Sequence, residues 1–148
     1  MNVQDVVSGK GAAILALAND RTLEDAVTMM AQHNVGSLAV VDAKGHALGI
    51  ITEPDIVTAI ARGGAPSLLR GVSHAMRTPA PACDADTHVA DAMALMTRTR
   101  VRYLLVERHG RTVGIVSIGD LVKARLESAE LESRVLRDIA RGAVLARA

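Results

Sequence analysis

Two short segments of the sequence pair a hydroxyl side chain with a carboxylate at the same spacing. GIITEPD ends at Asp55 and GIVSIGD ends at Asp120. The apolar run in each is typical of a strand, and the hydroxyl residue after it, Thr52 or Ser117, is a preferred helix N-cap. A helix N-terminus favours phosphate through its free N–H groups and dipole, and a nearby carboxylate can accept hydrogen bonds from ribose hydroxyls. The pattern therefore favours binding of a nucleoside phosphate.

The same spacing also has a purely structural explanation. In a capping box, the hydroxyl accepts a hydrogen bond from the N–H three residues later, and the acidic side chain accepts one from the N–H of the cap residue. Many helices use this arrangement with no ligand present, and Thr22 with Asp25 has the same spacing. The spacing alone leaves both interpretations open.

Both segments belong to an internal repeat, which is the strongest pattern in the sequence. Asp120 follows Asp55 by 65 residues (120 − 55), and an amphipathic stripe at i, i+3, i+4, i+7 returns after 66 residues (89 − 23). The stripe residues are Leu23, Ala26, Val27 and Met30 in the first copy and Val89, Ala92, Met93 and Met96 in the second. Two independent features that recur after almost the same number of residues indicate a duplication.

Each copy predicts the element order β-α-β-β-α. In the first copy we expect a strand near 13–17, a helix from Thr22 to about Asn34, strands Ser37–Val41 and Ala47–Ile51, and a helix from Thr52 to about Arg62. In the second copy we expect a helix from Asp86 or Thr87 to about Arg98, strands Tyr103–Glu107 and Thr112–Val116, and a helix from Ser117. Short lead-in turns over Val3–Val7 and Val72–Met76 precede the copies. The fold class is α+β.

The repeats must associate, because about sixty residues cannot bury such an apolar surface alone. We expect the two copies to pack face to face about a pseudo-twofold axis. The predicted divisions are 1–66 for the first domain, 67–126 for the second and 127–148 for an additional C-terminal helix.

The composition excludes several functions. The chain is 49% apolar and has a net charge of +1 and one aromatic residue, Tyr103. No nucleic acid partner and no membrane partner are therefore expected. Met1–Lys10 lacks the apolar core of a signal peptide, and a single cysteine, Cys83, suits a reducing compartment, so we expect a cytoplasmic protein. The five histidines lack metal-ligand spacing and no catalytic group emerges, so no metal and no enzymatic activity are predicted.

Taken in order, the motifs resemble the CBS-domain family over about residues 3 to 126. The matching pieces are the two lead-ins, Val35–Asp42 as a middle strand, Arg100–Val106 as the segment written R-x-R-h-h-P-V in the family, and the two hydroxyl–acid segments. The resemblance implies a pair of CBS repeats, known as a Bateman module, with two candidate nucleotide sites in the cleft between the repeats. It implies AMP, ADP, ATP or NAD as a regulatory ligand, with no required cofactor.

The resemblance also implies roles for individual residues. Asp55 and Asp120 would hold ribose, Thr52 and Ser117 would reach phosphate, and Arg102 would pair with phosphate. The adenine would lie against Ala13-Ile14, Ala80-Pro81-Ala82, Leu38 and Val101. Pro54 and Gly119 stand where many relatives carry a basic residue, and Leu105 replaces a common proline. Because Arg102 corresponds to Gly36 in the first copy, the Asp120 site ranks above the Asp55 site. Because one basic contact to phosphate is missing, AMP, ADP or NAD ranks above a triphosphate.

The segment from Glu127 to Ala148 predicts a further helix with Leu131, Val135 and Ile139 on one side. It can cover its own module, join a homodimer or dock a partner protein, and the disc-like dimers of the resembled family favour the homodimer. The leading hypothesis is a nucleotide-responsive regulator that signals to a protein target not specified by the sequence. The alternatives are a ligand-free dimerisation scaffold and, less favoured, a nucleotide hydrolase.

Overall fold

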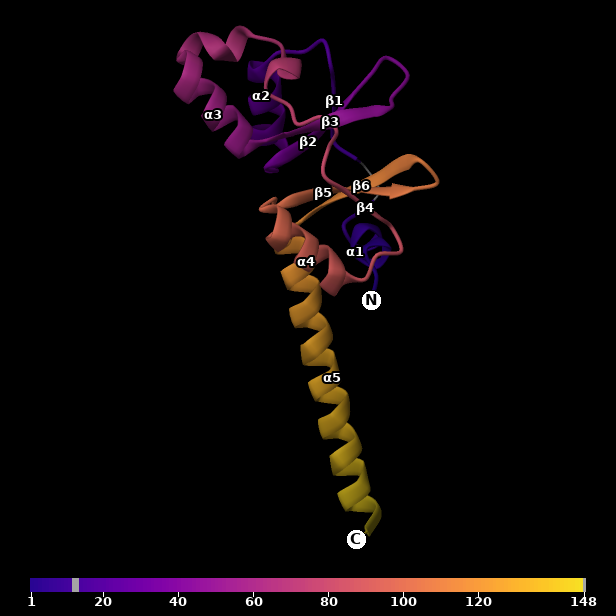
Figure 1. Ribbon diagram of the computed structural model, residues 1–148. Helices are drawn as coiled ribbons and strands as arrows, with labels where there is room; N and C mark the ends of the chain where they lie inside the picture. Colours follow the sequence, from indigo (N-terminus) through magenta and orange to yellow (C-terminus); the bar gives the residue numbers. More distant parts are fainter. Residues whose placement is uncertain (12–13, 148) are drawn as a thin grey trace.

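Each half of the chain folds into a three-stranded sheet with helices on one face, as the computed structural model shows for residues 1–11 and 14–147 (Figure 1). The first repeat contains β1 (Ala16–Ala18), α2 (Leu23–His33), β2 (Ser37–Val41), β3 (Ala47–Thr52) and α3 (Glu53–Gly63). The second contains β4 (Ala82–Asp84), α4 (Val89–Thr99), β5 (Tyr103–Arg108), β6 (Arg111–Ser117) and α5 (Ile118–Arg147). The helix α1 (Val3–Gly9) and two 3-10 turns, η1 (Ala65–Leu69) and η2 (Val72–His74), complete the chain.

The two sheets have the same topology. In the order β1-β2-β3 the first pair is parallel and the second antiparallel, and β4-β5-β6 repeats this arrangement. The predicted α+β fold built from two similar repeats is thereby confirmed. The first strand begins at Ala16, later than predicted, and Ala13 of the predicted strand lies outside the described residues.

The middle strands are apolar on both faces, because helices cover one face of each sheet and the other sheet covers the second face. On β2, Leu38 and Val40 point to the helices of their own repeat, whereas Ala39 joins Ile50 and Leu105 in a third cluster between the two sheets. Burial of each leucine, isoleucine or valine side chain contributes roughly 2 kcal/mol to the stability of the fold. The sheets therefore pack against each other through a shared apolar layer, as the repeat pattern predicts.

The two lead-in segments cross to the opposite repeat. Val3 and Val6 of α1 pack in the core of the second repeat, and the Val3 N–H donates to the Thr87 carbonyl at 2.8 Å. Val72 of η2 lies in the core of the first repeat. A limit between residues 66 and 67 therefore does not separate the two hydrophobic cores.

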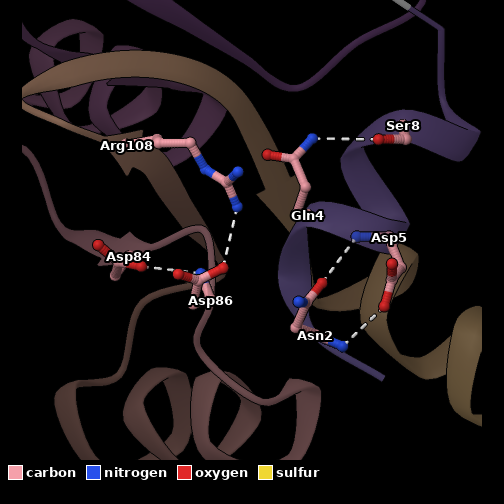
Figure 2. A network of polar contacts seen from close by, with 7 residues as sticks. All are labelled: Asn2, Gln4, Asp5, Ser8, Asp84, Asp86 and Arg108. Carbon is pink, nitrogen blue, oxygen red and sulfur yellow. Dashed lines mark hydrogen bonds and ion pairs between the residues drawn. The ribbon is translucent and has the colours of Figure 1, made fainter.

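Figure 2 shows this crossing at the start of the chain. Asn2 and Asp5 close the capping box of α1, and the helix lies next to the turn in which Asp86 pairs with Arg108 at 2.9 Å. The start predicted for α4 is wrong. The helix begins at Val89 with His88 as its N-cap, because residues 85–87 form a turn whose carbonyls accept from the start of α1, and His88 is extended and bridged to Asn2. The repeat offset of 66, applied to Thr22, gives His88 directly.

The C-terminal segment is not a separate helix. α5 continues without a break from Ile118 to Arg147, and its second half projects away from the repeats (Figure 1). Leu121 and Ala124 still pack in the core of the second repeat, whereas every described side chain from Ala129 to Gly142 is exposed. No helix in the described ranges has the length and apolar content that a membrane crossing requires.

Candidate ligand-binding site

Ser117 and Asp120 lie where β6 ends and α5 begins. The Asp120 N–H donates to Ser117 Oγ at 3.0 Å, and the Ser117 N–H donates to Asp120 Oδ2 at 2.8 Å. The arrangement is a complete capping box, so these two side chains already have a structural role. The Ser117 hydroxyl hydrogen is not used by these bonds and can be donated.

A cavity of about 400 Å³ opens beside this capping box, at the seam between the repeats. Lys10 and Ile14 line it from the segment before β1, and Asn34–Ser37 line it from the start of β2. The second repeat contributes Tyr103 and the end of β6, together with Ser117 and Asp120. The volume lies within the range of small-molecule sites. Residues from both repeats therefore enclose one hollow next to a helix N-terminus.

Lys10 places a cation in this cavity. Its Nζ lies 2.6 Å from Asp120 Oδ2 and 3.0 Å from the Ile115 carbonyl oxygen. Burial raises the pKa of Asp120, but the hydrogen bonds from Lys10 and from the Ser117 backbone outweigh burial, so the pKa lies below its ordinary value of 3.8. Asp120 is therefore a carboxylate at neutral pH, and it can only accept hydrogen bonds.

Tyr103 forms the aromatic wall of the cavity. Burial, followed by the charges of Glu53 and Asp120, raises its pKa, so the phenol stays protonated and can donate as well as accept. The hydroxyl lies against the Cα of Gly36, where a Cβ atom would overlap it. Gly36 thus allows the ring to cross from the second repeat to the first.

The junction between β3 and α3, where Thr52 and Asp55 lie, has a different arrangement from the junction between β6 and α5. The Thr52 hydroxyl donates to Asp55 Oδ2 at 2.7 Å, and Arg77 Nε donates to Asp55 Oδ1 at 3.1 Å. Thr52 is buried, and the cavity that touches Asp55 is lined by residues of α3 and the segment after it, including Arg62 and Arg70. Within the described chain, neither Thr52 nor Arg102 lines that cavity.

The structure brings together only part of the predicted site. Ser117, Asp120 and Ile14 line the seam cavity. Gly119 is exposed beside it, Ala80 packs between the sheets, and the Pro81 carbonyl accepts from the Leu105 N–H at 2.9 Å. None of these last three is among the described residues that line the cavity.

Three further residues of the predicted site lie outside the lining of the seam cavity in the described structure. Leu38 is fully buried among the helices of its repeat, because strand alternation turns Ala39, and not Leu38, toward the opposite sheet. Val101 packs on the core of the second repeat. Arg102 is exposed and does not line the seam cavity in the described part of the chain, whereas its counterpart Gly36 does. The phosphate contact of Arg102, and the ranking of the two sites that depends on it, therefore stay predictions.

Lys10 and Tyr103 are the residues that the sequence reasoning missed. Lys10 is 110 positions from Asp120, and no local spacing links the two residues. Tyr103 stood in the sequence only as the first residue of a predicted strand and as the one aromatic side chain. Its place beside the predicted phosphate partner Arg102, at the start of a middle strand, was the available signal.

The CBS domain family matches this chain twice, over residues 12–62 and 72–127. The chain is 39% identical over 134 residues to the CBS domain-containing protein CBSX3, mitochondrial, of Arabidopsis thaliana, which covers 82% of this chain and 63% of that protein. It is 32% identical over 123 residues to the CBS domain-containing protein YhcV of Bacillus subtilis, covering 81% of this chain and 82% of YhcV. The chain belongs to the CBS-domain family.

Solved structures agree with this assignment. The CBS-domain containing protein ATU1752 from Agrobacterium tumefaciens superimposes with a TM-score of 0.80 at 40% identity, covering 84% of this chain and 92% of that chain. The CBS domain pair of protein MJ0100, solved with 5-methylthioadenosine and S-adenosyl-L-methionine, has a TM-score of 0.74 at 23% identity, covering 88% of this chain and 98% of its own, and shares the fold. The chain spans 63% of the length of CBSX3 and of a 17.7 kDa protein of Acidianus ambivalens.

Proposed function

We propose that this protein binds an adenine nucleotide, AMP, ADP, ATP or NAD, in the seam cavity and thereby regulates a partner protein without catalysing a reaction. One observation carries the proposal. A cavity of about 400 Å³ built from both repeats combines an ionised carboxylate, a hydroxyl at a helix N-terminus, a lysine and a tyrosine. These are the groups that recognise ribose, phosphate and a flat base.

Each group has a distinct part in the proposed complex. The contacts of Asp120 with Lys10 and Ser117 both use Oδ2, so Oδ1 can accept from the ribose hydroxyls. The Ser117 hydroxyl and the Gly119 N–H donate to phosphate, since the Ile118 N–H already donates to the Arg102 carbonyl and the Asp120 N–H to Ser117 Oγ. The Lys10 ammonium has three hydrogens and can contact the phosphate while it remains beside Asp120.

The adenine ring is proposed to lie on the apolar side of the cavity, between Ile14, Val35 and Ile115, with Tyr103 at its edge. The fold relationship to the MJ0100 pair, whose ligands both contain adenosine, supports an adenosine-type ligand. Because Ile14 and Val35 belong to the first repeat and Ile115 to the second, bound ligand contacts both repeats. It shifts their arrangement if its affinity differs between two states.

Isothermal titration calorimetry with AMP, ADP, ATP, NAD and S-adenosylmethionine tests the proposal, together with mass spectrometry of any small molecule that co-purifies. We expect at least one adenine compound to bind with a stoichiometry of one for the seam cavity. Flat titrations with all five compounds and no co-purifying adenine compound would reject the proposal and favour a ligand-free scaffold.

The same samples test whether the protein is an enzyme. After prolonged incubation with Mg²⁺, chromatography should return the bound nucleotide unchanged. Turnover that disappears in an Asp120→Ala variant would instead establish a hydrolase and would overturn the regulatory assignment.

A further inference from the structure

A second cavity lies on the first repeat, between α3 and the segment 63–77 that links the two repeats. Its volume is about 500 Å³, which is within the range of small-molecule sites. One face of α3 lines it with four side chains at i, i+3, i+4, i+7 spacing: Asp55, Thr58, Ala59 and Arg62. Thr52, the predicted phosphate partner, does not line it in the described structure. We call this hollow the linker cavity.

Positive charge is concentrated in the linker cavity. Its described lining contains the arginines 62, 70 and 77 and one acid, Asp55, which gives a local charge of +2 (3 − 1) in a chain whose net charge is +1. His74 adds a further hydrogen-bond donor to the lining. A cleft lined mostly by charges of one sign focuses the electrostatic potential and attracts ions of the opposite sign. The lining therefore favours an anionic ligand.

The guanidinium groups of this cavity have donors that the fold does not use. Within the described part of the chain, Arg62 and Arg70 have no ion-pair partner. Arg77 donates to Asp55 Oδ1 through Nε at 3.1 Å, so its two terminal nitrogens can donate elsewhere. A guanidinium pairs with phosphate through two parallel N–H bonds, which a lysine cannot reproduce. The free donors therefore suit phosphate oxygens.

The backbone that carries these side chains is fixed by hydrogen bonds and close packing. The buried Ser67 hydroxyl donates to the Ala59 carbonyl of α3 at 3.0 Å, and Gly63 lacks the Cβ atom that would overlap this hydroxyl. The Arg70 carbonyl accepts from the Leu23 N–H at 2.9 Å, which ties the linking segment to the start of α2. Because these walls are already ordered, a ligand need only order the side chains on binding.

The second repeat arranges the same helix positions differently. The repeat offset of 65 carries Thr58 to Lys123 and Arg62 to Glu127, and on α5 these two side chains form an ion pair at 3.8 Å. On α3 the positive charge of Arg62 follows a neutral hydroxyl instead. A basic residue in the last turn of a helix complements the helix dipole, but this effect explains neither Arg70 nor the hydroxyl. Charge is thus balanced within α5 and left free in the linker cavity.

We propose that the linker cavity binds a small molecule that carries two adjacent phosphate groups, as in pyrophosphate. Each guanidinium can serve one pair of phosphate oxygens, so three guanidiniums from separate turns of the chain suit more than a single phosphate. The Thr58 hydroxyl and the His74 ring donate to the remaining oxygens. The proposal does not rest on nucleotide binding, because the described linings of the linker cavity and the seam cavity share no residue.

Isothermal titration calorimetry with inorganic pyrophosphate, in buffer without divalent cations, tests the proposal. We expect one pyrophosphate per chain and an affinity at least about tenfold higher than for orthophosphate. The variant R62Q/R70Q should bind pyrophosphate at least about tenfold more weakly, because two charged donors are lost. The matched control R134Q/R137Q removes the same charge from the exposed part of α5 and should bind within about twofold of the parent.

Two results would overturn the proposal at this stage. The first is a parent protein that shows no saturable binding of pyrophosphate. The second is an equal loss of affinity in R62Q/R70Q and R134Q/R137Q, since the anion would then respond only to the net charge of the chain. Circular dichroism of both variants should show an unchanged fold, because all four altered side chains are exposed.

Amide NMR titration of the parent locates the anion and identifies the source of its phosphate groups. Pyrophosphate should shift the amide signals of Gly63, Gly71 and His74 at the linker cavity and leave those of Gly36 and Gly114 at the seam cavity unchanged. The reverse pattern would overturn the proposal. ADP carries the same two adjacent phosphates on a nucleoside. If ADP also shifts the first set of signals, the site accepts an organic diphosphate, and if only pyrophosphate does, the ligand is inorganic; either result supports the site.

Discussion

The two strand-to-helix junctions that carry a hydroxyl and an acid have the same motif and different surroundings. Here the first corner is the β3–α3 junction with Asp55, and the second corner is the β6–α5 junction with Asp120. At the second corner, both known contacts of Asp120 use Oδ2, and the cavity between the repeats opens beside it. At the first corner, Thr52 and Arg77 occupy both oxygens of Asp55, and Thr52 is buried. Duplication therefore preserved the helix start in both halves, while the segments that cross from the other half made the two corners unequal.

Each sheet is approached closely by a segment near the start of a repeat, Arg77 at Gly49 and Val7 at Gly114, and the difference between these two contacts should give the largest effect on stability. A Cβ at Gly49 would collide with the backbone carbonyl of Arg77, whereas one at Gly114 would lie 2.7 Å from a methyl group of Val7. A backbone cannot move without breaking the ladder between Ile50 and Arg77, but a side chain can rotate. We expect Gly49→Ala to lower the free energy of unfolding by about 3 kcal/mol and Gly114→Ala by about 1 kcal/mol.

Urea denaturation of both variants measures this difference. Gly45→Ala is a poor control, because its φ of 82° already disfavours alanine. Gly9→Ala is suitable, since nothing lies near its Cβ position. Equal losses for Gly49→Ala and Gly114→Ala would contradict the asymmetry.

Replacing each acid by alanine should give the next largest contrast, in the affinity for the nucleotide. Asp120→Ala removes the proposed ribose acceptor and should weaken nucleotide binding about 30-fold, as expected for loss of a hydrogen bond to a charged group. Asp55→Ala should change the affinity less than about twofold, because Asp55 lies outside the seam cavity in the described structure. Calorimetry on both variants decides. An Asp120→Ala protein that binds as tightly as the parent would remove Asp120 from the site.

The helix caps of the two repeats offer a smaller contrast. Thr22 and Asp25 exchange two hydrogen bonds at the start of α2, whereas His88 Nδ1 accepts one, from the Ala90 N–H at 3.2 Å. Thr22→Ala should destabilise the protein by about 1 kcal/mol, and His88→Ala should destabilise it by about 0.3 kcal/mol. Thermal unfolding of the two variants at one pH compares them. A larger effect for His88→Ala would show that its ring has a further role in packing.

The pH dependence of Asp120 should give the smallest effect. Because its pKa is lower in the folded chain, the carboxylate stabilises the fold above the pKa of the unfolded chain, and this contribution disappears as the pH falls through the folded value. The Lys10→Met variant should raise the pKa of Asp120, a shift that carboxyl carbon NMR titration can follow. The exposed position of Lys10 keeps the stability change small. An unchanged pKa in Lys10→Met would show that Lys10 does not hold Asp120 in solution.

Much of the fold was predictable because it depends on short-range patterns. Most of the two stripes that begin at Leu23 and Val89 became the buried faces of α2 and α4, although Val27 is exposed, and Ser37–Val41 formed the predicted strand. Errors occurred where a distant segment intervened. The helix α4 starts later than predicted because the start of α1 bonds to the backbone before it. The sequence also could not show that Leu38 faces the helices of its own repeat, because both faces of β2 are buried and apolar.

The sequence alone determined the duplication, the element order and the two helix starts with a hydroxyl and an acid, since each of these is set by residues within a few positions of one another. Only the tertiary structure decided that Lys10, Gly36 and Tyr103 meet Asp120 in one cavity. These contacts arise because the lead-in segments cross over and the sheets pack face to face, and no local pattern records which residues that packing brings together.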